Sequence, residues 1–314
     1  MKLFLGVDGG QSGTKAVIGD ETGLILGTGE AGPCNHAAAG EGRAKLERAI
    51  RGSVGEACAQ AALDPEVVEF EAACFGMSGG PEDKREILAA ILHVHHVVVT
   101  NDAVIALTGA TATGEGIITI AGTGSIAFGR NREGRTARAG GWGYIFGDEG
   151  SGFDIVRRAV RASLRMEEGW GPATRLREVL LEATHSHDAN HMLHRFYNDE
   201  WPRSRVARLA PLIERLALES DAAAMEIIQS AAQELAMLAG AVRQQLWACG
   251  GAIQVAYIGG VFESGPLLER FRLLVELAEG VRCGPPRYGP AEGALLEAYR
   301  AAGLSVSDVH NAIG

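Results

Sequence analysis

The chain has 314 residues, of which 46% are hydrophobic and 22% charged, a balance typical of a globular protein with a substantial core. Its net charge of −10 and the lack of a Lys/Arg-rich stripe argue against nucleic-acid binding. No uninterrupted apolar stretch of about 18 residues occurs, so a transmembrane helix is not expected. The short apolar run at the N-terminus is not typical of a signal peptide. We therefore expect a cytoplasmic protein with neither a membrane nor a nucleic-acid partner.

The cysteine and histidine patterns give no support for a metal site built by the protein alone. The five cysteines are widely spaced and include no CxxC pair, whereas zinc sites and iron–sulfur clusters are commonly built on close pairs. The HVHH segment at 93–96 places its histidines at neighbouring positions of a helix-to-strand junction, a poor arrangement for coordination. We expect buried or idle thiols in a reducing compartment.

Short apolar runs that end in glycine predict strands at the start of the chain. LFLGVD at 3–8, KAVIGD at 15–20 and LILGTG at 24–29 predict three neighbouring strands separated by glycine-bearing turns. The elements expected next are a helix at 42–62, a strand at 71–79, a helix at 82–92, a buried strand at 96–102 and a helix that begins at about 102, with Asn101 or Asp102 as its N-cap.

The pattern then starts again. GIITIAGTGSIAFG at 116–129 predicts strand, glycine turn and strand, as residues 3–19 do, and 135–143 supplies a third strand. The region 151–248 is mostly helical, with a clear apolar stripe in its last helix. The elements expected after it are a strand at 252–260, a helix at 263–278 with Ser264 as its N-cap, and a final helix at 290–303.

This duplication predicts an α/β protein made of two related domains. The first spans 1–114 and the second 115–288, with a helical insertion at about 151–248. We expect the helix at about 289–303 to pack back on the first domain.

Two glycine-rich turns between strands are candidate phosphate-binding loops. In the segment 8–15, DGGQSGTK, backbone N–H groups can point at an anion, while Thr14 adds a hydroxyl and Lys15 a charge. AGTGS at 121–125 occupies the matching place in the second half. A tight hairpin is the alternative for each, and neither is a Walker A loop because GxxxxGK[ST] is absent. Because the two turns occupy matching places in the two halves of the chain, they favour a site that binds a polyphosphate from both sides.

Two further segments are rich in glycine. GGWGYIFGDEGSGF at 140–153 is not typical of a helix or a plain strand, and it carries two adjacent carboxylates, Asp148 and Glu149. YIGGVFES at 257–264 predicts a strand, a Gly-Gly turn that lets a ring approach the backbone, and the start of a helix. Taken alone, a simple strand-to-helix connection explains the second segment.

Taken together, VDGGQSGTKAV, TNDA, AGTGSIAFG, GGWGYIFGDEGSGFDI and YIGGVFESG resemble the N-acetylglucosamine kinases. These belong to the BadF/BadG/BcrA/BcrD-type branch of the actin-like, hexokinase-like and Hsp70-like ATPases. The resemblance runs from about residue 3 to 302 in the family's order. It implies two RNase H-like (actin-like ATPase) domains with ATP and a sugar in an interdomain cleft. The activator ATPases of this branch carry cysteines for an iron–sulfur cluster, and no comparable pattern occurs here.

The resemblance also implies three sets of site residues. For Mg²⁺ it implies Asp8, acting through water. The residues that it implies for ATP are Gly10, Gly13, Thr14, Lys15, Gly122, Thr123, Gly124, Gly259, Gly260 and Ser264. The residues that it implies for the sugar are Asn35, His36, Ser78, Asp102, Ser125, Gly141, Trp142, Gly143 and Asp148. Glu149 is expected to be a structural partner of the following helix start.

Asp102 is the candidate catalytic base. It follows an apolar strand, and open α/β sheets place ligand-binding groups at the carboxyl ends of their strands. Phosphoryl transfer to a hydroxyl needs a carboxylate that orients the hydroxyl and accepts its proton. The alternative is a helix N-cap, a position that favours both Asp and Asn. The surrounding motifs favour the catalytic interpretation.

The sequence therefore predicts a kinase that transfers the γ-phosphoryl group of MgATP to the 6-hydroxyl of N-acetylglucosamine. One alternative keeps the fold and changes the sugar to glucosamine, N-acetylmuramic acid or another hexose, which the sugar-side loops do not distinguish. The other alternative is a sugar-responsive ATPase or binding protein without kinase activity. The related kinases are often homodimers, although no feature of this sequence indicates an interface.

Overall fold

The computed structural model describes residues 1–10, 13–34, 42–77, 84–198, 200–247 and 251–304. The chain divides into two compact units, Met1–Gly116 together with Pro286–Gly314, and Ile117–Pro285. Each unit contains a five-stranded sheet flanked by helices, which confirms the predicted α/β fold class.

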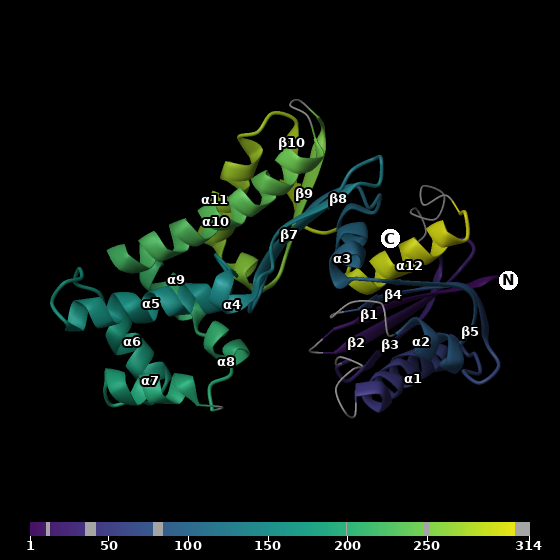
Figure 1. Ribbon diagram of the computed structural model, residues 1–314, viewed down its shortest axis with the longest axis horizontal. Coiled ribbons are helices and arrows are strands. Elements are labelled where there is room, and N and C mark those ends of the chain that lie inside the picture. The colour runs from purple at the N-terminus through teal and green to yellow at the C-terminus, as the bar shows by residue number, and fades with distance from the viewer. Residues whose placement is uncertain (11–12, 35–41, 78–83, 199, 248–250, 305–314) are drawn as a thin grey trace. The chain divides into compact units, whose positions relative to one another are not determined.

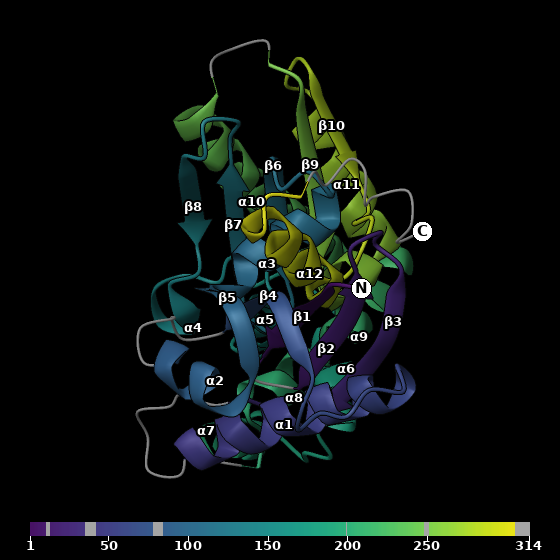
Figure 2. The ribbon, with the colours of Figure 1, turned by 90° about the vertical axis from the view of Figure 1, so that its right-hand side faces the viewer.

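The first sheet combines antiparallel and parallel strands. Their order is β3 (Ile25–Ala31), β2 (Thr14–Asp20), β1 (Leu3–Gly9), β4 (Glu69–Met77) and β5 (His93–Thr100), as Figure 2 shows. The pairs β1–β2 and β2–β3 are antiparallel, whereas β4 runs parallel to β1 and β5 parallel to β4. Nearly all residues of β1 and β4 are buried, as expected for strands covered on both faces. The carboxyl ends of β1, β4 and β5 therefore meet at one edge of the sheet.

Helices cover both faces of this sheet (Figure 1). One core joins it to α1 (Gly42–Gln60) and α2 (Arg85–Ile91). A separate core joins it to α3 (Asp102–Thr111) and α12 (Pro290–Ala301). The last helix of the chain thus completes the first unit. The strand β5 begins at His93, three residues before the expected start.

The helix α12 lies so close to its neighbours that glycine is required on both sides of the contact. A Cβ atom on Gly6 of β1 would lie 2.2 Å from the backbone nitrogen of Leu295. A Cβ atom on Gly293 would lie 2.0 Å from the carbonyl oxygen of Ile105 and 2.5 Å from the nitrogen of Gly109. Because these neighbours are backbone atoms, they cannot turn away as a side chain would.

Gly293→Ala should therefore destabilise the protein by about 3 kcal/mol, the upper part of the usual cost of overpacking. Urea unfolding measures the change. The matched control is Gly55→Ala in α1, where an added Cβ atom meets nothing within 4 Å. That substitution should raise the free energy of unfolding by up to about 1 kcal/mol, because alanine is the better helix former. Equal effects of the two substitutions would contradict the close-packing explanation.

The second sheet repeats the strand order of the first. Its strands lie in the order β10 (Val281–Gly284), β9 (Ile253–Ile258), β6 (Gly116–Ala121), β7 (Ser125–Arg130) and β8 (Thr136–Gly140). As in the first unit, the strands at one side are parallel and the hairpin at the other is antiparallel. No strand was expected at β10, which is only four residues long.

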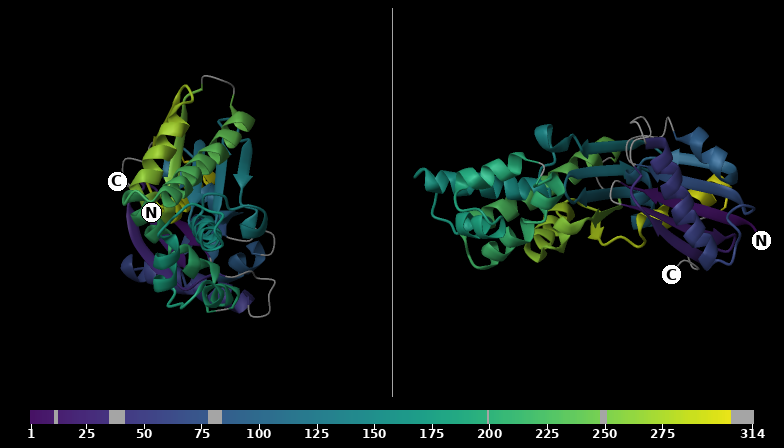
Figure 3. Two further views of the ribbon diagram at one scale, coloured as in Figure 1. Left: turned by 90° about the vertical axis from the view of Figure 1, so that its left-hand side faces the viewer. Right: turned by 90° about the horizontal axis from the view of Figure 1, so that it is seen from below.

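The helices of the second unit share one core with its sheet. The first helices of the insertion extend past one end of the sheet (Figure 3), whereas its last helix packs against β7 and β8. In chain order the helices are α4 (Gly143–Phe146), α5 (Gly152–Glu167), α6 (Leu176–Ala183), α7 (Ala189–Tyr197), α8 (Arg203–Ala207), α9 (Ala210–Leu218), α10 (Ala222–Leu246), the 3₁₀ turn η1 (Gly260–Glu263) and α11 (Gly265–Glu276). None of the helices in the described residues is long and apolar enough to cross a membrane.

Candidate functional site

The first glycine turn connects β1 and β2. The N–H group of Gly10 donates to the carbonyl oxygen of Gly13 at 2.9 Å, which closes the turn. Thr14 is 3% exposed, and its hydroxyl donates to the carbonyl oxygen of Gly32 and contacts the sulfur of Cys34, both at 2.9 Å. These contacts connect the turn to the residues that directly follow β3. A phosphate contact by Thr14 stays a prediction and would use the lone pairs that its hydroxyl keeps.

Three carboxylates and one lysine gather beside this turn. Asp8 and Lys15 are directly paired across β1 and β2. Lys15 Nζ lies 3.2 Å from Glu292 Oε1 on α12. Burial is the main cause that raises the pKa of Asp8 to about 6, and the charges of Asp102 and Glu292 raise it further while Lys15 lowers it. A carboxylate that resists ionisation and lies near other acids is suited to a bound cation.

Glu292 was not among the residues predicted from the sequence. Its Oε2 atom is buried and finds no hydrogen-bond partner among the described residues. It meets Lys15 across 277 positions of sequence, so no local pattern could have indicated the pair. Only the packing of α12 on the first sheet brings them together.

Asp8→Asn should stabilise the unliganded protein at high pH. The folded-state pKa of Asp8 lies above its ordinary value, so the folded protein favours the protonated carboxyl group. This contribution to the free energy of unfolding is complete below about pH 4 and is lost as the pH rises through about 6. The variant should exceed the wild type in unfolding free energy by roughly 2 kcal/mol at about pH 8 and by little at about pH 4. Urea titrations at both pH values, without nucleotide, measure this. A difference that does not change with pH would contradict it.

Asp102 is the first residue of α3 and follows the carboxyl end of β5. The N-cap of α3 is Asn101, whose side-chain oxygen accepts the N–H group of Val104 at 3.0 Å. The capping role that the sequence left open for Asp102 therefore belongs to its neighbour. Asp102 is also close enough to Asp8 for its charge to raise that carboxyl's pKa.

The second glycine turn connects β6 and β7 and resembles the first. The N–H group of Gly122 donates to the carbonyl oxygen of Gly124 at 2.9 Å, so a glycine–glycine hydrogen bond closes this turn as well. The carbonyl oxygen of Gly122 also accepts the N–H group of Gly152 at 2.8 Å, which joins the turn to the start of α5. Thr123 lies at the tip and is half-buried.

Asp148 lies against this turn and is 5% exposed. Its Oδ1 atom accepts the backbone N–H group of Ser125 at 3.3 Å, and a Cβ atom on Gly124 would lie 2.9 Å from both carboxylate oxygens. The φ angle of Asp148 is 63°, an uncommon conformation for a residue other than glycine. Such strain is found preferentially at functional sites. The structure thus brings together Asp148 and Ser125, which were both predicted to contact the sugar.

The segment after Asp148 forms the start of α5. Ser125 Oγ donates to the carbonyl oxygen of Glu149 at 2.7 Å. The carboxylate that supports the helix start is Asp154, which accepts the N–H group of Gly150 at 3.1 Å. Ser151 is the N-cap. Glu149 contributes to the start of α5 through its backbone carbonyl oxygen, which accepts the hydrogen bond from Ser125.

The Gly140–Gly143 stretch also contacts Ser125. The N–H group of Gly141 donates to the carbonyl oxygen of Ser125 at 2.9 Å. Gly141 and Gly143 have φ angles of 72° and 76°, which glycine adopts without strain. Trp142 is 64% exposed, with the guanidinium carbon of Arg138 4.6 Å from its ring centroid. The short helix α4 follows, in a segment where no helix was expected.

The predicted adenosine-side residues lie at the end of β9. A Cβ atom on Gly259 would lie 2.2 Å from the carbonyl oxygen of Ala121, so glycine lets β9 approach β6. Gly260 and Ser264 line a cavity of about 220 Å³. Ser264 occupies the N-cap position of α11, but its side chain makes no capping hydrogen bond. Its Oγ atom is buried without a hydrogen-bond partner among the described residues.

Three predicted sugar-side residues, Asn35, His36 and Ser78, lie outside the described residues. Within the part of the chain that is described, no three His, Cys, Asp or Glu side chains are grouped so that they could hold a metal ion. Mg²⁺ bound to nucleotide needs no such group, because it takes one or two carboxylates together with phosphate oxygens and water. Half-buried Asp8 and exposed Asp102 fit that requirement as one or two carboxylates.

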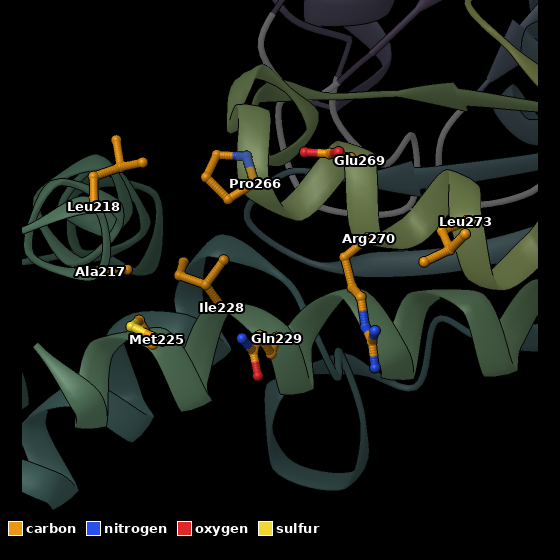
Figure 4. A pocket seen from close by; sticks show the side chains of 9 residues that line it. All are labelled: Ala217, Leu218, Met225, Ile228, Gln229, Pro266, Glu269, Arg270 and Leu273. Carbon is orange, nitrogen blue, oxygen red and sulfur yellow. The ribbon is translucent and has the colours of Figure 1, made fainter. Parts of the chain in front are cut away.

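A cavity of about 350 Å³ lies elsewhere in the second unit, between α9, α10 and α11. Figure 4 shows mostly apolar side chains along it, including Leu218, Ile228 and Leu273, with the charged residues Glu269 and Arg270 on α11. None of the predicted site residues lines it.

Sequence comparison places these features among known proteins. The chain is 32% identical over 285 residues to an N-acetylmuramic acid/N-acetylglucosamine kinase of Clostridium acetobutylicum, covering 88% of this chain and 91% of the relative. It is 32% identical over 263 residues to an N-acetyl-D-glucosamine kinase of Dictyostelium discoideum, covering 78% of this chain and 80% of the relative.

Comparison with solved structures also identifies a similar amino-sugar kinase. A crystal structure of a candidate N-acetylglucosamine kinase from Chromobacterium violaceum matches with a TM-score of 0.75 at 26% identity, over 94% of this chain and 98% of that one. The model of the BadF/BadG/BcrA/BcrD ATPase family matches residues 5–298. The resemblance seen in the five sequence segments is thereby confirmed, and the chain belongs to the BadF/BadG/BcrA/BcrD ATPase family.

Proposed function

We propose that the protein is an ATP-dependent sugar kinase that transfers the γ-phosphoryl group of MgATP to the 6-hydroxyl of N-acetylglucosamine. The observation that carries this proposal is the position of Asp102, after β5 and beside Asp8, with the helix cap supplied by Asn101. A carboxylate at the carboxyl end of such a strand can act on a ligand. The names of the relatives, which are kinases of amino sugars, support the choice of substrate.

We assign ATP to the two glycine turns and to the segment that follows β9. Backbone N–H groups of the two glycine turns, other than those of Gly10 and Gly122 that close them, would donate to the phosphates, with Thr14, Lys15 and Thr123 adding polar contacts. Ser264 Oγ, buried and unpartnered within the described residues, would serve the adenosine side together with the Gly259–Gly260 backbone. Asp8 would hold Mg²⁺ through water, and the bound ion would neutralise charge on the transferred phosphate.

The sugar would be held by hydrogen bonds to its hydroxyls. Asp148 keeps one carboxylate oxygen against Ser125 and can offer the remaining lone pairs of its carboxylate to the sugar. The backbone of Gly141–Gly143 would form a surface beside it, and exposed Trp142 could cover an apolar sugar face. The sequence-based assignments of Asn35, His36 and Ser78 are retained as part of this proposal.

Asp102 would orient the acceptor hydroxyl and take its proton. As the hydroxyl oxygen bonds to the γ-phosphorus, the bond to the β,γ-bridging oxygen breaks and ADP leaves. Little covalent chemistry is required of the protein, so positioning and electrostatic stabilisation would supply most of the rate.

A panel of sugars tests the proposal. ADP release is followed with ATP and N-acetylglucosamine, glucosamine, N-acetylmuramic acid or glucose, and the product is examined by phosphorus NMR. Sugar-dependent ADP release with phosphate on the 6-oxygen supports the proposal. ADP release that ignores every sugar would favour an ATPase without kinase activity. Phosphorylation of glucose or glucosamine alone would move the function to that sugar.

A further inference from the structure

A cavity of about 560 Å³ lies in the second unit, where α4, α5, α7 and α8 meet (Figure 1). Its volume is within the range of small-molecule binding sites. None of the residues predicted to contact ATP or the sugar lines it, and neither does Asp102. The function proposed above therefore leaves this cavity without a role.

The walls of the cavity are apolar and rich in aromatic rings. Five of its fourteen lining residues are aromatic, whereas aromatic residues make up 6% of the chain. The rings of Tyr144 and Phe153 meet edge to face, with their centroids 5.5 Å apart. Phe196 and Trp201 meet in the same way at 5.6 Å. Because aromatic rings prefer such edge-to-face and offset contacts, these walls suit a ligand with a flat apolar ring.

The charged groups of the lining are all cations. Arg157, Arg161 and Arg203 line the cavity, and no Asp or Glu does so among the described residues. Arg203 stacks on Tyr144, with its guanidinium carbon 4.6 Å from the ring centroid. Its Nη1 atom lies 3.9 Å from Asp148 Oδ2, beyond hydrogen-bonding distance. Because the chain as a whole carries a net charge of −10, this local excess of positive charge runs against the overall balance.

Two buried N–H donors of the lining have no partner within the described residues. They are Nε1 of Trp201, a residue that is only 5% exposed, and Nε of Arg157. Arg157 uses its other donors on Asp154 at 2.6 Å and on the carbonyl oxygen of Tyr144 at 3.1 Å. A buried donor without a partner costs about 1–3 kcal/mol. A ligand that brings an acceptor to these donors would recover part of that cost.

The donors alone do not decide the charge of the ligand, because a neutral acceptor could take the same hydrogen bonds. The three guanidinium groups favour an anion, since electrostatic attraction is stronger where apolar walls exclude water. A carboxylate suits guanidinium donors, and a ring suits the aromatic walls.

We propose that this cavity is a separate ligand site that binds a small aromatic carboxylate. The proposal goes beyond the kinase function and does not depend on it, because the residues assigned to ATP, the sugar and catalysis lie outside the lining.

Calorimetric titration of the wild type with 2-naphthoate tests the proposal, in the absence of ATP and sugar. We expect saturable binding at a single site. 2-Naphthamide has the same ring and an acceptor oxygen but no charge, so it should bind roughly 10- to 100-fold more weakly. Octanoate keeps the carboxylate without the ring and should bind roughly 2- to 10-fold more weakly. Inorganic phosphate, which has no apolar part, should not saturate the site in the same concentration range.

Two substitutions separate the charged donor from the neutral one. Arg203→Gln should weaken 2-naphthoate by roughly 3- to 10-fold, since its side chain is 48% exposed, and should change 2-naphthamide little. Trp201→Phe keeps a ring but removes the N–H donor, so it should weaken both probes alike. The matched control is Arg138→Gln, which removes another arginine that stacks on an aromatic ring but lies outside the lining. It should bind both probes as the wild type does.

Leu218→Gln tests whether the probe occupies the other apolar cavity of the same unit, which Leu218 lines. The affinity for 2-naphthoate should not change, and a loss would overturn the proposal because the probe would lie in the wrong cavity. The absence of saturable binding, equal affinity for 2-naphthoate and 2-naphthamide, or tighter binding of octanoate would overturn it as well. Because no titration contains ATP or sugar, a failure of the kinase function would leave these outcomes unchanged.

Discussion

Asp102→Asn should lower turnover by roughly 10²–10⁴-fold, the usual contribution of a general base, while the sugar still binds. The substitution keeps the size of the side chain and a hydrogen-bonding oxygen but removes the group that accepts the proton. Steady-state kinetics measure the loss, and calorimetric titration with N-acetylglucosamine measures binding. Turnover like that of the wild type would exclude Asp102 as the base.

The neighbouring residue supplies the control for this experiment. Asn101 caps α3 through its contact with Val104, so Asn101→Ala should lower the free energy of unfolding by about 1 kcal/mol. Asp102→Asn should change stability less, because the loss of the favourable interaction with the helix dipole, roughly 0.3–1 kcal/mol, is offset by relief of the repulsion between Asp102 and Asp8. If Asp102→Asn destabilised α3 as much as Asn101→Ala does, the activity loss could reflect a disordered helix start.

The parts of this fold that local patterns describe were predictable. β1 is an apolar run buried on both faces, and α10 repeats its apolar positions with helical spacing over 25 residues. The restart of the strand–turn–strand pattern at β6 reflects the second sheet, whose strand order matches the first. In contrast, β10 and α4 have four residues each, too few for a period to become visible.

The types of residue in the candidate site were predictable from the sequence, whereas the contacts between them were not. Glycine turns and an aspartate after a strand are visible in sequence, but the meeting of Lys15 with Glu292 depends on the packing of α12. No pattern in sequence distinguishes Asn101 from Asp102 as the cap, since both residue types are favoured there.

Asp148→Asn should lower kcat/KM for the sugar by roughly 10- to 100-fold, because a hydrogen bond to a charged group contributes about 1.5–3 kcal/mol. The amide oxygen can still accept the N–H group of Ser125, so the glycine turn should keep its shape and KM for ATP should change little. The loss should appear mainly in KM for the sugar, since a ground-state contact is removed. A large rise in KM for ATP would instead indicate that Asp148 shapes the phosphate loop.

Asp154→Asn is the matched control for that prediction. Asp154 is a buried carboxylate in the same segment, but it contacts Arg157, Arg158 and the N–H group of Gly150. The substitution removes charge-assisted hydrogen bonds to both arginines, so we expect a loss of roughly 1.5–3 kcal/mol in stability. At temperatures where this variant is folded, its KM for the sugar should stay near the wild-type value. If both variants raised KM equally, the sugar contact assigned to Asp148 would be indistinguishable from general support of the α5 start, and that assignment would have to be given up.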